Sequence, residues 1–126
     1  MKKIFTFFII GATIVACKSG EDQKKEEAKK VVVDITKNPD YQKGLKLTAK
    51  SDCFTCHKID EKNIGPAWRD VANKYSGVKG VEEILAKKII EGGSGVWGEI
   101  PMAPHVNFSE EDAKSIVRYI LLMKNN

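Results

Sequence analysis

Three residues near the middle of the chain, Cys53, Cys56 and His57, stand at a spacing that suits chemistry at one shared site. The segment reads Cys-Phe-Thr-Cys-His and matches C-x-x-C-H, the attachment sequence of c-type haem. On a helical turn, cysteines three residues apart point the same way, so each sulfur can form a thioether with one haem vinyl group. The following residue, His57, is then brought under the iron as an axial imidazole ligand.

Three other interpretations of these residues compete with haem attachment. A thioredoxin-like dithiol needs a βαβ context, which the sequence lacks, and would leave His57 without a role. A structural zinc site needs four ligands, and only the distant His105 could complete the set. A disulfide between Cys53 and Cys56 would close a very short loop and would stabilise little. Haem attachment is therefore the favoured interpretation.

The iron of a haem has a sixth position, for which the chain offers Met102, His105 and Met123. Met102 lies between Pro101 and Pro104, where a stiff backbone could hold a thioether toward the metal. Met123 falls in the last helical turn and is expected to pack or fray. His105 is the serious rival, so the residues by themselves leave the sixth ligand open.

Length and charge narrow the function further. The chain has 126 residues, of which 42% are hydrophobic and 30% charged, which suits one small domain and excludes a large multidomain enzyme. The formal net charge is +4, and loss of Lys2 and Lys3 with a cleaved leader would reduce it to about +2. Positive and negative charges are therefore nearly balanced, which does not indicate a nucleic-acid-binding protein.

The first residues are typical of an export signal. Lys2 and Lys3 precede an apolar stretch from Ile4 to Ala16, which is shorter than the about 20 residues that a spanning helix needs. The stretch ends Ile-Val-Ala-Cys, which resembles the lipobox of bacterial lipoproteins. We expect a lipoprotein signal peptide over residues 1–16 and a lipid on Cys17. The alternative, an ordinary secretory signal, would leave Cys17 as an odd reactive thiol.

A charged segment follows Cys17. Residues 18–30 contain five lysines and four acids but no large apolar side chain, so they cannot bury a core. We expect residues 17–37 to be a flexible tether and residues 38–126 to be the folded domain.

The domain is predicted to be all-α. Four helices are expected: from Asn38-Pro39-Asp40 to about Ser51, from Ala67 to Tyr75, from about Val81 to Gly92, and from a Ser109/Asp112 capping box onward. No segment alternates like a strand, and the glycine- and proline-rich stretch from Gly92 to Pro104 is expected to be an irregular loop. Helices this short bury little apolar surface, so a cofactor should complete the core.

From about Asn38 to its end, the chain resembles a small bacterial class I cytochrome c of the c-551/c-552 group. The resemblance rests on Cys-Phe-Thr-Cys-His at 53–57, Ile-Gly-Pro-Ala-Trp at 64–68, and Gly-Val-Trp-Gly-Glu-Ile-Pro-Met at 95–102. It implies four to five short helices around one covalently attached haem. Thr48 and the Met-Ala-Pro-His sequence ending at His105 depart from the usual pattern of the family.

The resemblance also implies roles for single residues. It makes Met102 the sixth ligand and reduces His105 to a loop residue. It gives Pro66 the task of orienting His57 through its carbonyl. Trp97 and Lys88 would meet the haem propionates. Gly44 would allow the first and last helices to cross at Tyr119.

Histidine and methionine together leave no vacancy on the iron, which favours electron transfer over catalysis. We expect a monomeric lipoprotein on the periplasmic side or cell surface of a bacterial membrane. It would carry single electrons in a respiratory chain, from a quinol-oxidising complex to a terminal oxidase or reductase. The alternatives are a haem-based sensor or small-ligand-binding protein and a weak peroxidase, each with a labile sixth ligand.

Overall fold

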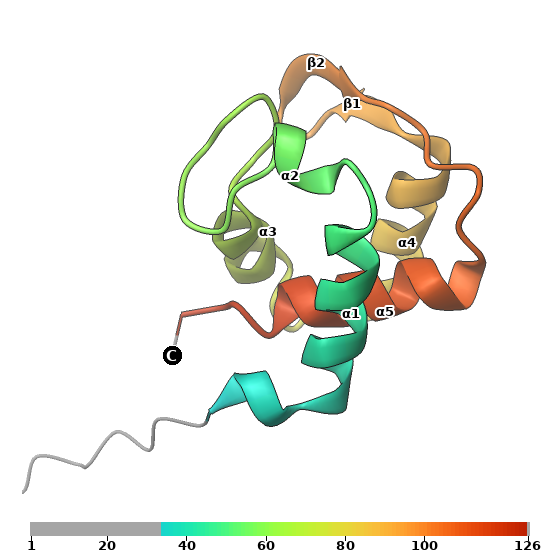
Figure 1. Ribbon diagram of the computed structural model, residues 1–126. Helices are drawn as coiled ribbons and strands as arrows, with labels where there is room; N and C mark the ends of the chain where they lie inside the picture. The colour runs from blue at the N-terminus through green and yellow to red at the C-terminus, as the bar shows by residue number, and fades with distance from the viewer. Residues whose placement is uncertain (1–33, 126) are drawn as a thin grey trace, which may run out of the picture. The chain divides into compact units, whose positions relative to one another are not determined.

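The computed structural model describes residues 34–125, and the expected leader, Cys17 and most of the tether lie outside them. The elements, drawn in Figure 1, are η1 (Ile35–Lys37), α1 (Pro39–Ala49), α2 (Cys53–Cys56), α3 (Trp68–Tyr75), α4 (Val81–Glu91), β1 (Gly93–Gly95), β2 (Gly98–Met102) and α5 (Glu110–Leu121). Of the described helices, none is both long and apolar enough to cross a membrane.

Side-chain caps begin the first and last of the long helices, as their sequences predict. The side chain of Asn38 accepts a hydrogen bond from the backbone N–H of Asp40 at 2.8 Å, directly before Pro39 in the first turn of α1. The hydroxyl of Ser109 accepts from the N–H of Asp112 at 3.1 Å at the start of α5. Each cap satisfies one of the backbone donors that a helix start leaves free.

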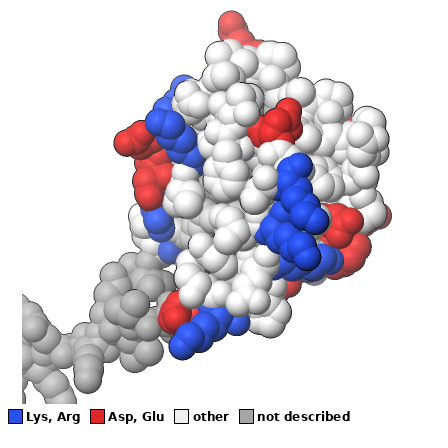
Figure 2. Space-filling model, in the orientation of Figure 1, with Lys and Arg blue, Asp and Glu red and all other residues white. Residues whose placement is uncertain are grey.

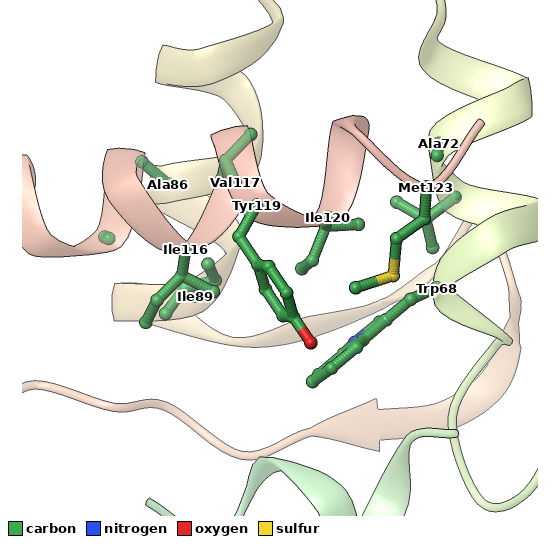
Figure 3. Packing of buried hydrophobic residues seen from close by; sticks show 11 residues of the cluster. Trp68, Ala72, Ala86, Ile89, Ile116, Val117, Tyr119, Ile120 and Met123 are labelled. Atoms are coloured by element: carbon green, nitrogen blue, oxygen red, sulfur yellow. The ribbon is translucent and has the colours of Figure 1, made fainter. Parts of the chain in front are cut away.

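Helix α5 is the centre of the core and packs against α1, α3 and α4. Figure 3 shows its side chains Ile116, Tyr119 and Ile120 among residues of the neighbouring helices, with Met123 beside Trp68. Met123, which is 4% exposed, is therefore a packing residue. Burial raises the pKa of Tyr119 to about 12, since the ionised phenolate would lose its hydration.

The crossing of α1 and α5 depends on Gly44. A β-carbon at this position would lie 2.1 Å from Cβ of Tyr119 and 2.7 Å from the carbonyl oxygen of Ser115. The ring of Tyr119 then packs edge-on against Tyr41 of α1 and Trp68 of α3, at centroid distances of 5.0 and 5.7 Å. One small residue thus lets two backbones approach and brings three helices together.

An ion-pair network links helix α5 to α1 and α4. Arg118 of α5 donates hydrogen bonds to Glu111 at 2.6 Å, and to Glu82 of α4 and Asp40 of α1 at 3.0 Å each. The bond to Glu111 contributes most to keeping the pKa of Arg118 above its usual value. One guanidinium, with its rigid fork of donors, therefore links three helices.

The stretch expected to be an irregular loop contains a short antiparallel ribbon, so the prediction that no strand forms is wrong. Gly93 pairs with Met102 and Gly95 with Gly98. Gly93, Gly95 and Gly98 all have positive φ values, of 118°, 112° and 126°, which only glycine adopts readily. Almost every side chain of the ribbon is exposed, so no apolar alternation marks the strands in the sequence.

We predict that Gly44→Ala destabilises the protein by about 1–3 kcal/mol, the usual cost of overpacking a tight contact. Alanine is the better helix former by about 1 kcal/mol, so the opposite sign would be expected if the crossing did not matter. Denaturant unfolding measures the change, with Lys46→Ala on the exposed face of α1 as the control. An unfolding midpoint at or above that of the wild type would contradict the packing argument.

Candidate functional site

Helix α2 is one turn long and carries both cysteines of the motif. Cys53 and Cys56 are free and partly buried. Burial, followed by the negative charge of Asp52, raises the pKa of the Cys53 thiol. The helix ends at His57, whose extended backbone (φ −116°, ψ 143°) turns the chain away while its N–H still bonds the carbonyl of Cys53 at 3.0 Å.

The ring of His57 is held by the segment Gly65-Pro66. Its Nδ1 lies 2.8 Å from the carbonyl oxygen of Pro66. A carbonyl can only accept a hydrogen bond, so Nδ1 must carry the proton, and Nε2 keeps its lone pair for a metal. This is the contact that the resemblance implied for Pro66.

Two neighbours restrict the ring of His57 further. A β-carbon on Gly65 would lie 2.4 Å from Cε1 and 2.8 Å from Nδ1 of His57, so the bare backbone of this glycine is pressed against the ring. Trp68 stacks near the imidazole with a centroid distance of 6.0 Å and an interplanar angle of 22°. Trp68 is 3% exposed and is foremost a core aromatic. The ring can therefore neither rotate nor tilt freely.

Met102 is brought to the site by the ribbon, because it is the last residue of β2 and pairs with Gly93. Its backbone is packed tightly. A β-carbon on Gly92 would come within 2.4 Å of the Met102 carbonyl oxygen. Met102 is partly buried and packs against the core. Its backbone is therefore fixed by the ribbon on one side and by Gly92 on the other.

These residues surround one cavity of about 450 Å³. Cys53, Cys56, His57 and Met102 all line it, and helices α3, α4 and α5 supply mainly apolar walls through Trp68, Val71, Tyr75, Leu85, Ile89, Ile116, Val117 and Ile120. The volume lies in the range of about 300–1,000 Å³ that is typical of ligand and cofactor pockets. An apolar cavity with two thiols, an imidazole lone pair and a thioether fits a haem.

Cationic and aromatic side chains are among the residues that line this cavity. Lys88 and Trp97 line it, as does Lys62, which the sequence did not single out. The ammonium group of Lys74 lies 5.5 Å from the centroid of the Trp97 ring. Trp97 is 38% exposed, so it borders the cavity and the solvent together. The arrangement suits the carboxylates of haem propionates.

His105 also lines the cavity, but its Nε2 lies 3.2 Å from a carboxylate oxygen of Asp52. The two residues are 53 positions apart, so no local pattern could have revealed this pair. Within residues 34–125, no three His, Cys, Asp or Glu side chains are grouped so as to hold a metal ion. The zinc interpretation therefore finds no ligand set in this part of the chain.

Comparison with known proteins agrees with this geometry. Residues 41–124 match the family described as cytochrome c. Cytochrome c-552 of Nitrosomonas europaea is 45% identical over 83 residues, which are 66% of this chain and 81% of that protein. Cytochrome c-551 of Pseudomonas aeruginosa is 44% identical over 78 residues, covering 62% and 74% of the two chains.

Solved structures give the same result. The crystal structure of Nitrosomonas europaea cytochrome c552 matches with a TM-score of 0.60 at 46% identity and covers 63% of this chain and 98% of that one. The class 1 cytochrome MtoD of Sideroxydans lithotrophicus matches with a TM-score of 0.55 at 28% identity, over 65% and 94% of the chains. The family match over residues 41–124 includes Cys53, Cys56, His57 and Met102.

We predict that Gly65→Ala displaces the His57 ring and breaks its hydrogen bond to Pro66. Stability of the haem-loaded protein should fall by about 1–3 kcal/mol, as for other overpacked sites. The reduction potential should rise, because an imidazole without this bond is a weaker donor to ferric iron. Denaturant unfolding and voltammetry measure the two effects. The exposed Lys58→Ala is the control, and a Gly65→Ala protein that matches it in both measurements would refute the prediction.

Proposed function

The chain belongs to the cytochrome c family, and from this we propose that it is a lipid-anchored electron shuttle whose single haem is ligated by His57 and Met102. Proteins of this family bind one covalent c-type haem, transfer electrons and are not enzymes. The family assignment covers the class I cytochrome c fold and the cofactor. The ligands, the anchor and the partners are our proposal.

Some of the residues that would hold the haem attach it covalently, and others bind its iron. Cys53 and Cys56 provide the two thioether bonds, and His57 presents Nε2 as the proximal ligand. The observation that carries this assignment is the 2.8 Å contact between Nδ1 of His57 and the Pro66 carbonyl, which leaves only Nε2 free to bind a metal. When bound, the haem supplies a one-electron couple between ferric and ferrous iron.

Met102 supplies the second axial ligand in this proposal. It lines the same cavity as His57, and its backbone is fixed by the ribbon and by Gly92. A thioether is a soft ligand that stabilises ferrous iron, so it raises the reduction potential relative to a second imidazole. Two protein ligands that both stay in place also keep the reorganisation small during electron transfer.

Trp97 and Lys88 complete the site on its polar side. We assign the indole N–H of Trp97 and the ammonium group of Lys88 to the propionates, because both side chains line the cavity. Lys62 stands at the same cavity and adds a second positive charge. Positive charges beside the propionates would favour their ionised form.

The redox partners would dock as a weak and transient complex. Ile64, Val96 and Ile100 line the cavity and are 50%, 58% and 67% exposed, which gives the site an apolar rim. Figure 2 shows uncharged residues over much of one face, with basic and acidic groups both present around them. The docking of this monomer with a quinol-oxidising complex, and then with a terminal oxidase or reductase, should therefore depend little on salt.

The ligand assignment predicts that Met102→Ala abolishes the near-infrared charge-transfer band from sulfur to ferric iron. The potential should fall by more than about 0.1 V, within the ~0.8 V range that axial ligands span. Absorption spectroscopy and voltammetry give the two readouts, and His105→Ala should keep the band. Loss of the band in His105→Ala instead, or rapid binding of carbon monoxide by the reduced wild type at neutral pH, would contradict the assignment.

The anchor predicts that Cys17→Ser releases the protein from membranes. The lipid would be attached to the Cys17 thiol, and a hydroxyl in its place cannot be modified in the same way. Fractionation of the producing cells, followed by detection of the haem in the membrane and soluble fractions, measures the change. Lys18→Ser is the matched control and should stay in the membrane fraction. If Cys17→Ser stays in the membrane fraction to the same extent as the wild type, the anchor is excluded, but the electron-transfer function is not.

A further inference from the structure

The side chain of His105 joins two segments that both belong to the site. Its Nε2 lies 3.2 Å from Oδ1 of Asp52. Asp52 directly precedes Cys53, and His105 follows Met102 by three residues. The contact therefore links the start of the cysteine helix α2 to the loop that leaves the Met102 strand.

His105 is the best-anchored residue of that loop. Its N–H donates to the carbonyl of Ile89 in α4 at 3.0 Å, and its carbonyl accepts from the N–H of Phe108 at 3.1 Å. The ring of Phe108 lies near its imidazole, with a centroid distance of 6.1 Å. The His105 side chain is 20% exposed, whereas that of Asp52 is 82% exposed. Asp52 thus reaches over the surface and meets a ring that the fold already holds.

The hydrogen bond also defines the form of the ring. An ionised carboxylate only accepts, so Nε2 of His105 carries a proton. Nδ1 is buried and has no partner among the described residues. Among residues 34–125, the imidazole of His105 therefore forms one hydrogen bond, and its partner is Asp52.

A short segment of backbone connects Met102 to His105. Only Ala103 and Pro104 separate the two residues, and Pro104 stiffens this connection. A second cavity of about 320 Å³ is lined by Ser51, Asp52, His105 and Phe108. Both members of the Asp52–His105 contact therefore border open space.

We propose that Asp52 and His105 form a clasp that holds the Met102 loop closed over the haem cavity. Both are positioning residues, because they act on the iron site through Met102. The clasp rests on the proposed function, in which Met102 is the sixth ligand. It slows the detachment of the thioether from the iron and so protects a site that exchanges only electrons.

The test measures how often the loop opens. Cyanide added to the ferric, haem-loaded protein must replace the sulfur of Met102, so at saturating cyanide the limiting rate of binding reports how fast Met102 leaves the iron. We expect Asp52→Ala and His105→Phe each to raise this limiting rate about two- to five-fold, the size expected for one partly exposed polar contact of about 0.5–1 kcal/mol. The double variant should be no faster than the faster single one, because both remove the same contact.

Controls separate the clasp from general destabilisation. The side chain of Asp52 makes no capping hydrogen bond to α2, so its removal leaves that helix start unchanged. Glu61→Gln removes an exposed ion pair with Lys58, away from the Met102 loop, and should bind cyanide at the wild-type rate. His105→Gln keeps an N–H donor and should bring the rate back toward wild type. Rates that follow global stability alone, including that of Glu61→Gln, would overturn the clasp.

The same spectra separate this proposal from the function on which it rests. If the near-infrared sulfur band survives in Met102→Ala, the ligand assignment is wrong and the clasp falls with it. If Met102→Ala loses the band but Asp52→Ala and His105→Phe bind cyanide at the wild-type limit, the ligand assignment stands and the clasp alone is wrong.

Discussion

The hydrogen bond between Nδ1 of His57 and the Pro66 carbonyl is the interaction on which the site depends. It fixes the tautomer of the ring and with it the one nitrogen that can bind a metal. The chain builds this contact with three adjacent features: a helix that ends at His57, a glycine at 65 with no β-carbon, and a proline whose carbonyl is free to accept. A bulkier residue at 65 would disturb all of them.

Helices α3, α4 and α5 form part of the protein core and also line the cavity. Helix α5 contributes to the protein core and lines the cavity with Ile116, Val117 and Ile120. The crossing at Gly44 places α5, and the ribbon places Met102. Core and cofactor pocket therefore share one set of apolar side chains. A bound haem would complete the packing that so short a chain cannot complete alone.

The features that could be predicted from the sequence are those whose signals lie within a few residues of one another. The helices were predictable because caps such as Asn38 and Ser109 and the apolar stripe of α5 act over a few residues. The cysteine motif was equally local. The ribbon at 93–102 was missed, since exposed glycine-rich strands have no alternation to detect. The Asp52–His105 contact and the place of Lys62 depend on tertiary structure, which no spacing along the chain reveals.

The ribbon that delivers Met102 has a consequence for association between molecules. A two-stranded sheet has two open edges, and such edges invite strand addition by a second chain. In β2 the residue before Met102 is Pro101, which lacks an N–H, and two residues earlier stands the charged Glu99. Both disfavour a third strand. The edge of β2, which the proposed function places next to redox partners, is thereby disfavoured for pairing with a second copy of the chain.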